Sequence, residues 1–143
     1  EHTRGHLVKA LLEGVAYNLR WIFENYKQDF GFNPGTIRAI GGGSVNGSWM
    51  QGIANITGKT VETVDRPTMA GALGAASCAF VGSGQFRSFQ DIRQFIEVEN
   101  SFEPDPSLNT LYTKLFHSYQ DVYRGLKKAY IRANLERFNQ ENN

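Results

Sequence analysis

The sequence feature that most constrains the fold is the run TIRAIGGGSVNGSWMQ, residues 36–51. A short apolar segment, residues 37–40, ends at three consecutive glycines, residues 41–43. An apolar helical pattern follows, so the run predicts a strand, a tight glycine turn and a helix that starts near Asn46 or Gly47. Glycines permit positive φ and let a ligand approach the main chain. The unpaired N–H groups at the start of the helix point back at this turn, which favours an anionic ligand such as a nucleotide.

Two other interpretations of this turn remain open on the residues alone. It is also what a plain strand-to-helix connection without a ligand looks like. A dinucleotide site requires G-x-G-x-x-G and an acidic residue about 20 positions later. Gly42 to Gly47 has G-G-S-V-N-G, which lacks the middle glycine, although Glu62 and Asp65 lie near the required distance.

Length and composition predict one folded domain spanning residues 1–143. The chain is 41% hydrophobic and 13% aromatic, which is typical of a globular protein with a real core. A net charge of +1 gives no indication of a nucleic acid or an anionic membrane surface as a partner. Cys78 is the only cysteine, so an internal disulfide is excluded and a cytoplasmic location is expected. With one cysteine and three scattered histidines, a zinc site is not expected.

Helices and strands alternate along the rest of the chain. The patterns predict an amphipathic helix over residues 3–27, a strand over 59–64, a helix over 69–81, a short helix over 88–93, an irregular or edge segment over 96–102, and a long helix capped by Ser107 whose end, 139–143, frays. Thr3 and Thr68 are the expected caps of the earlier helices. The order predicts α/β architecture. Two clear strands are too few for a free-standing sheet, so we expect partner strands elsewhere in a longer chain.

The two long helices carry apolar stripes that are expected to face the core. The first stripe consists of Leu7, Leu11, Val15, Leu19, Ile22 and Tyr26, and the second of Leu108, Leu111, Leu115, Tyr119, Val122, Leu126, Ala129 and Ala133. The helix over residues 69–81 has almost no side-chain bulk, so we expect it to lie close to a sheet or to a bound ligand. Trp21 and Trp49 are expected in the core.

Three stretches in this order resemble the C-terminal part of FGGY-type carbohydrate kinases, and the xylulokinase-like branch most of all. The pattern HLxxALLE at residues 6–13 is similar to the closing half of the second signature of that family, with Leu11 departing from the small or β-branched residue usual there. The first half of the signature would lie before Glu1. Residues 40–51 are similar to the family's adenosine motif, and GALGAA at residues 71–76 follows at the matching distance.

The resemblance implies an actin-like ATPase fold, with this chain as the C-terminal ribonuclease-H-like domain or a fragment of it, with long packing helices. It implies that the backbone of Gly42 and Gly43 passes beside ATP. Ser44 to Gly47 would border the adenine and the ribose, and Asn46 is the best candidate for a side-chain hydrogen bond. In many members of the family the asparagine lies one position later, where this chain has Gly47. The small-residue helix would pack behind this pocket.

The resemblance also implies what the chain lacks. The parent reaction would be ATP-dependent phosphorylation of a sugar or polyol hydroxyl, with a pentulose such as xylulose expected. The catalytic aspartate, the Mg²⁺ ligands and most sugar contacts would lie in an N-terminal kinase domain of the same chain, so no catalytic or metal residue is assigned here and the chain alone is expected to be inactive. Glu62 and Asp65 are interpreted as surface residues.

Two alternatives to an active kinase stay open. One is a non-catalytic nucleotide-binding domain of the same superfamily. The other is a structural or dimerisation domain, in which the long last helix would form a homodimer.

Overall fold

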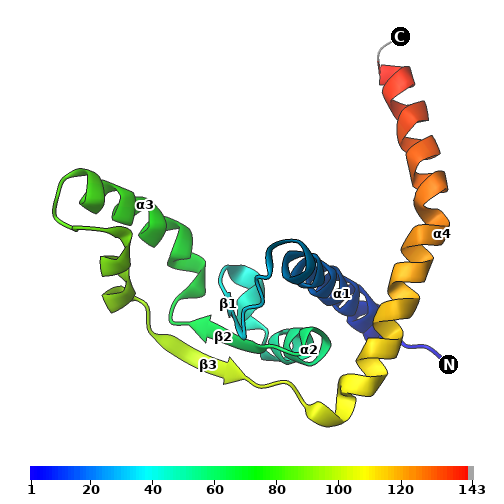
Figure 1. The fold of residues 1–143 in the computed structure, drawn as a ribbon, viewed down its shortest axis with the longest axis horizontal. Coiled ribbons are helices and arrows are strands. Elements are labelled where there is room, and N and C mark those ends of the chain that lie inside the picture. Colours follow the sequence, from blue (N-terminus) through cyan, green and yellow to red (C-terminus); the bar gives the residue numbers. More distant parts are fainter. Residues whose placement is uncertain (142–143) are drawn as a thin grey trace.

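A computed structural model describes the backbone of residues 1–141 and the side chains of residues 1–134. The predicted fraying concerns residues 139–143, of which 142–143 lie outside the described backbone. The main elements are α1 (Arg4–Phe30), β1 (Thr36–Ala39), α2 (Gly47–Thr57), β2 (Thr60–Val64), α3 (Ala70–Gly82), β3 (Val98–Phe102) and α4 (Asn109–Glu141). Single 3-10 segments connect them: η1 (Gly42–Val45), η2 (Pro67–Met69), η3 (Phe89–Phe95) and η4 (Pro106–Leu108). Figure 1 shows α3 and the far end of α4 extending from opposite sides of a small central sheet.

The sheet has three strands in the order β1-β2-β3. β1 runs parallel to β2, with Thr36 opposite Thr60, whereas β3 runs antiparallel to β2. The helix between β1 and β2 is the crossover that a parallel pair requires. The predicted α/β architecture is therefore confirmed, and the segment predicted as irregular or edge contains the edge strand β3.

The start and end of α1 follow from local side-chain and backbone chemistry. The Thr3 hydroxyl accepts the backbone N–H of His6 at 3.5 Å, and His6 Nδ1 accepts the backbone N–H of Thr3 at 3.0 Å. This reciprocal capping satisfies N–H groups that a helix start leaves unpaired, and it confirms Thr3 as the cap. Gly31 ends the helix in the left-handed region, at φ 67°.

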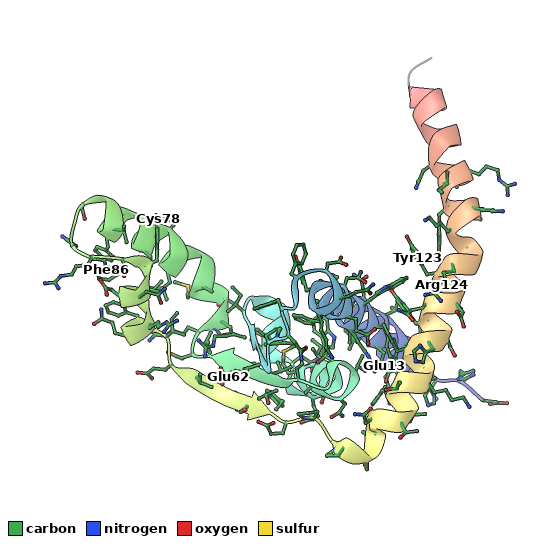
Figure 2. The ribbon with its side chains drawn as sticks, viewed as in Figure 1. Glu13, Glu62, Cys78, Phe86, Tyr123 and Arg124 are labelled. Atoms are coloured by element: carbon green, nitrogen blue, oxygen red, sulfur yellow. The ribbon has the colours of Figure 1, made fainter. Side chains whose placement is uncertain are left out.

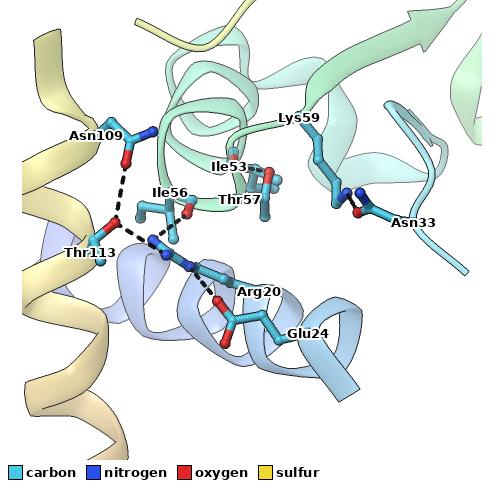
Figure 3. A network of polar contacts seen from close by, with 9 residues as sticks. All are labelled: Arg20, Glu24, Asn33, Ile53, Ile56, Thr57, Lys59, Asn109 and Thr113. Atoms are coloured by element: carbon cyan, nitrogen blue, oxygen red, sulfur yellow. Dashed lines mark hydrogen bonds and ion pairs between the residues drawn. The ribbon is translucent and has the colours of Figure 1, made fainter. Parts of the chain in front are cut away.

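The core lies where α1, α2 and α4 meet above the sheet. Its buried members are Ala16, Tyr17, Met50, Ile53, Ala54, Ile56, Val61, Tyr112 and Phe116. Trp21 and Trp49 pack against this cluster, which confirms their predicted place. The Arg20 guanidinium ties the three helices together: it donates to the Ile56 carbonyl and to the Thr113 hydroxyl, each at 3.2 Å, and pairs with Glu24 (Figure 3).

The predicted apolar stripes of the long helices are wrong in register. In α4 the buried residues are Tyr112 and Phe116, while Leu111 and Leu115 are 51% and 39% exposed. In α1 the buried residues are Ala16 and Tyr17, and most of the predicted stripe is exposed. The reason is that α1 contacts α2 and α4 through a face centred on Ala16, roughly opposite the stripe.

Two predicted caps are also wrong, because a proline-led 3-10 turn precedes each helix. The N-cap of α3 is Met69, without a side-chain hydrogen bond, so Thr68 does not cap it. At the start of η4 the Asp105 carboxylate accepts the backbone N–H of Ser107 at 2.9 Å, so Ser107 is capped rather than capping. Proline fits the first position of such turns since its missing N–H would be unpaired there.

In the part of the chain that the structure describes, no helix is both long and apolar enough to cross a lipid bilayer.

Candidate functional site

The glycine turn forms at the carboxyl end of β1, as the sequence predicts. Gly41 has φ 87° and is the only one of the three glycines in the positive-φ region, where L side chains are disfavoured. Its N–H donates to the Pro67 carbonyl at 2.8 Å, which ties this turn to the turn after β2. Gly42–Val45 then form the single 3-10 turn η1, and α2 starts separately at Gly47.

Ser44 stabilises the turn from within. It is 5% exposed, and its hydroxyl and backbone N–H both donate to the Gly41 carbonyl, at 2.8 and 3.2 Å. Its side chain is therefore committed to the turn, and only its backbone remains to border a ligand.

Asn46 is the N-cap of α2. Its side-chain oxygen accepts the backbone N–H of Trp49 at 3.1 Å. Capping uses the oxygen, so the amide nitrogen is the remaining polar group that this exposed side chain could offer to a ligand.

The remaining glycines are small for different reasons. A Cβ on Gly42 would meet no atom within 4 Å, so the main chain there is open to approach. A Cβ on Gly43 would lie 2.6 Å from Cζ3 of Trp49, and one on Gly47 would lie 3.5 Å from the Phe102 ring. The structure thus places Gly42 and Gly43 on an exposed rim, but it explains the glycine at 43 by an indole ring of the same chain.

A cavity of about 530 Å³ lies between α1, α2 and the start of α4. Asn46 is the one predicted site residue in its lining. The Glu13 carboxylate, where α1 approaches α4 (Figure 2), accepts the Tyr112 hydroxyl at 3.3 Å and lies 3.6 Å from Lys9 Nζ. Burial, and then the charge of Glu13, raises the pKa of Tyr112, so this phenol stays neutral.

A second cavity of about 720 Å³ lies at the carboxyl ends of β1 and β2, below α3. Its lining includes Ile40, Val64, Arg66, Leu73 and Phe95. Carboxyl ends of parallel strands are where open α/β sheets usually bind ligands. None of the five predicted site residues lines this cavity.

The close packing predicted for the small-residue helix is wrong for this chain. A Cβ added to Gly71 or Gly74 of α3 would meet no atom within 4 Å. The helix contacts η2 and η3 rather than a strand, and Cys78 on it is exposed (Figure 2). A bare helix face needs a partner to explain its composition, and the described residues do not supply one.

The acidic residues considered at first make surface ion pairs. Glu62 pairs across the sheet with Arg38 at 2.7 Å, and Asp65 pairs with Arg66 at 2.8 Å. Their interpretation as surface residues agrees with these contacts, although Glu62 is only partly exposed.

The sequence analysis missed the contribution of Arg66 and Pro67 to the turn. Arg66 is the only non-glycine residue at positive φ, 47°, among the described residues, and Pro67 supplies the carbonyl that accepts from Gly41. The Arg-Pro pair signalled the end of a strand, but no sequence pattern reports where a carbonyl points. Strained backbone of this kind clusters at ligand sites.

Comparison with known proteins identifies the family. The profile of the FGGY family of carbohydrate kinases, C-terminal domain, matches residues 1–83. The chain is 32% identical over 127 residues to the xylulose kinase of Bacillus subtilis, covering 88% of this chain and 25% of that protein. It is 35% identical over 137 residues to the glycerol kinase of Pseudomonas fluorescens, covering 92% and 25%. The chain therefore spans about a quarter of the length of these relatives.

Solved structures give the same answer for the fold. The xylulose kinase of Rhodospirillum rubrum superposes with a TM-score of 0.73 at 29% identity, covering 91% of this chain and 26% of that one. A ligand-bound xylulose kinase from Lactobacillus acidophilus superposes at 0.77 with 26% identity, covering 92% and 27%. The predicted actin-like ATPase fold is confirmed, and the chain belongs to the FGGY family of carbohydrate kinases, to whose C-terminal domain it corresponds.

Proposed function

We propose that this chain is the ATP-binding part of a kinase that phosphorylates a hydroxyl group of a pentulose such as xylulose. The relatives are named as xylulose kinases and glycerol kinases, which supports a sugar or polyol acceptor. The choice of a pentulose rests on the xylulose kinases among both the sequence relatives and the solved structures. A cytoplasmic location, where ATP is abundant, belongs to the same proposal.

The observation that carries the proposal is the open main chain at Gly42. This residue begins η1, and the first N–H groups of such a turn have no partner within it. α2 starts five residues later and directs its positive dipole end toward the same turn. We propose that ATP lies against the backbone of Gly42 and Gly43, with the Asn46 amide and the Gly47 backbone bordering the adenosine.

The residues present fit ATP better than they fit its metal. Kinases of this kind use Mg²⁺ to bridge the phosphates and neutralise developing charge. Among the described residues, no group of three or more histidines, cysteines, aspartates and glutamates comes close enough together to hold a metal ion. We therefore place the metal ligands and the general base in an N-terminal domain of the same polypeptide, which is also a partner of this chain.

The test is a titration of ¹⁵N-labelled chain with a non-hydrolysable ATP analogue and Mg²⁺, followed by NMR. Amides of Gly42, Gly43 and Gly47 should shift together, and those of Gly82 and Gly84 in the distant α3 loop serve as the control. Shifts confined to the α3 loop, or shifts that GTP and CTP reproduce equally, would contradict an adenosine site at the glycine turn.

A further inference from the structure

α1 presents an apolar face that no described residue covers. The face consists of Leu7, Val8, Leu11, Val15, Ile22 and Tyr26, which are 65%, 55%, 67%, 48%, 41% and 46% exposed. Helical spacing places no charged residue on this face between Arg4 and Asp29. Helices that border solvent usually carry polar residues there, so this composition indicates a face meant for burial.

The sheet is open on the side of β1. In the order β1-β2-β3, β1 pairs with β2 on one side and has no strand on the other. Its N–H and C=O groups on that side form a template for a further strand. Exposed edges of this kind are normally paired, covered or protected by charge.

The open edge and the exposed face belong to one layered arrangement. α2 contacts β2, and α1 packs beside α2 in the same helical layer. Ile37 and Ala39 of β1 pack against the cluster that contains Ala16 and Tyr17 of α1. A strand added to β1 would extend the sheet away from β2 and give the helical layer more sheet to cover.

The occupant follows from the lengths of the relatives. The chain covers 25% of the Bacillus subtilis kinase and 27% of the Lactobacillus acidophilus one, so three-quarters of each has no counterpart here. We propose that the open edge of β1 and the apolar face of α1 form one docking surface, filled by a β-strand from the part of the kinase polypeptide that this chain does not include. The inference rests on the proposed function, because a kinase supplies that part.

The recognition would use two kinds of contact. Main-chain hydrogen bonds to the edge of β1 would hold the strand, and its alternate side chains would have to be apolar to meet α1. An amphipathic helix would satisfy the apolar face but not the edge, which is why the proposal commits to a strand.

Cysteine labelling tests the proposal in a chimera in which this chain replaces the matching quarter of the Bacillus subtilis xylulose kinase. In a Cys78→Ser background, Leu11→Cys reports on the docking surface. Val122→Cys on α4, which is 61% exposed, is the matched control. Maleimide should react at similar rates with both variants of the isolated chain. In the chimera the rate at position 11 should fall by about tenfold or more, as expected for a site that must open first, while position 122 stays unchanged.

Equal rates at the two positions in a folded chimera would overturn the proposal. So would protection of position 11 in the isolated chain that grows with concentration, because a second copy would then be the occupant. A chimera that is insoluble while its two parts are soluble separately would also count against docking. Sugar-dependent release of ADP by the chimera is measured separately, so protection without activity would refute the proposed function and leave the docking surface standing.

Discussion

Substituting alanine for Gly42 separates ligand approach from folding. Gly42 is not in the positive-φ region, and its added Cβ meets nothing within 4 Å. The change should leave the free energy of unfolding unchanged or raise it by up to about 1 kcal/mol, because alanine restricts the unfolded chain. If ATP lies on this backbone, the methyl group occupies the path of the ligand. A steric cost of about 1–3 kcal/mol corresponds to roughly 5- to 100-fold weaker binding.

Gly43→Ala is the contrasting variant. The new Cβ would lie 2.6 Å from Cζ3 of Trp49, about 1 Å inside a normal carbon–carbon contact. Trp49 cannot move freely, because its ring nitrogen donates to the Leu12 carbonyl at 3.3 Å and it packs against the core. We expect a loss of about 1–3 kcal/mol in the free energy of unfolding, much of it restored by adding Trp49→Leu.

Two measurements on each variant decide the matter. Urea unfolding followed by circular dichroism gives stability, and titration with the ATP analogue gives affinity. The reasoning fails if Gly42→Ala binds ATP as tightly as the unchanged chain, or if Gly43→Ala unfolds at the same urea concentration. Both outcomes together would place the ligand elsewhere and remove the reason given for the glycine at 43.

Three further predictions concern buried polar groups and catalysis. The Tyr17 hydroxyl is buried without a hydrogen-bond partner, so Tyr17→Phe should stabilise the chain by about 1 kcal/mol in urea unfolding, whereas Tyr112→Phe, which loses its bond to Glu13, should not. Burial, and then Lys27, lowers the pKa of Lys59, so the unfolded chain binds more protons; stability should rise as pH approaches the ordinary value of 10.5, and Lys59→Met should abolish that rise. The isolated chain incubated with Mg²⁺-ATP and a panel of pentoses, hexoses and polyols should release no sugar-dependent ADP, because phosphoryl transfer needs a base and a metal held in line; turnover like that of intact kinases would place the base within these residues.

Sequence reasoning reached the elements around the site because their signals are local. A β-branched run before glycines, a cap residue before a helix and a glycine after it each act within a few positions. Thr3, Asn46 and Gly58 therefore appear at element ends as patterns of this kind predict. Where two local signals compete, as with Pro67 beside Thr68, the proline determines the start of the helix and the weaker capping signal fails.

The individual roles of the three glycines could not be predicted from their run. In the sequence they are identical neighbours, yet one has positive φ, one is open to solvent and one faces an indole ring. These differences depend on where Pro67 and Trp49 lie in space, and Pro67 is separated from the turn by a helix and a strand. A pattern that reports a turn therefore does not report which of its residues a ligand can reach.

The misassigned stripe of α1 has a different cause, since its periodicity is genuine. Periodicity reports which face of a helix is suited to burial, whereas the structure reports which face these residues bury. Six apolar side chains of α1 are 41–67% exposed, and at about 2 kcal/mol for each side chain fully buried, covering them would contribute on the order of 5 kcal/mol. That amount is comparable to the whole free energy of unfolding of an ordinary domain. A composition that forgoes so much stability in isolation is explained most simply if the rest of the kinase polypeptide supplies the surface against which α1 packs.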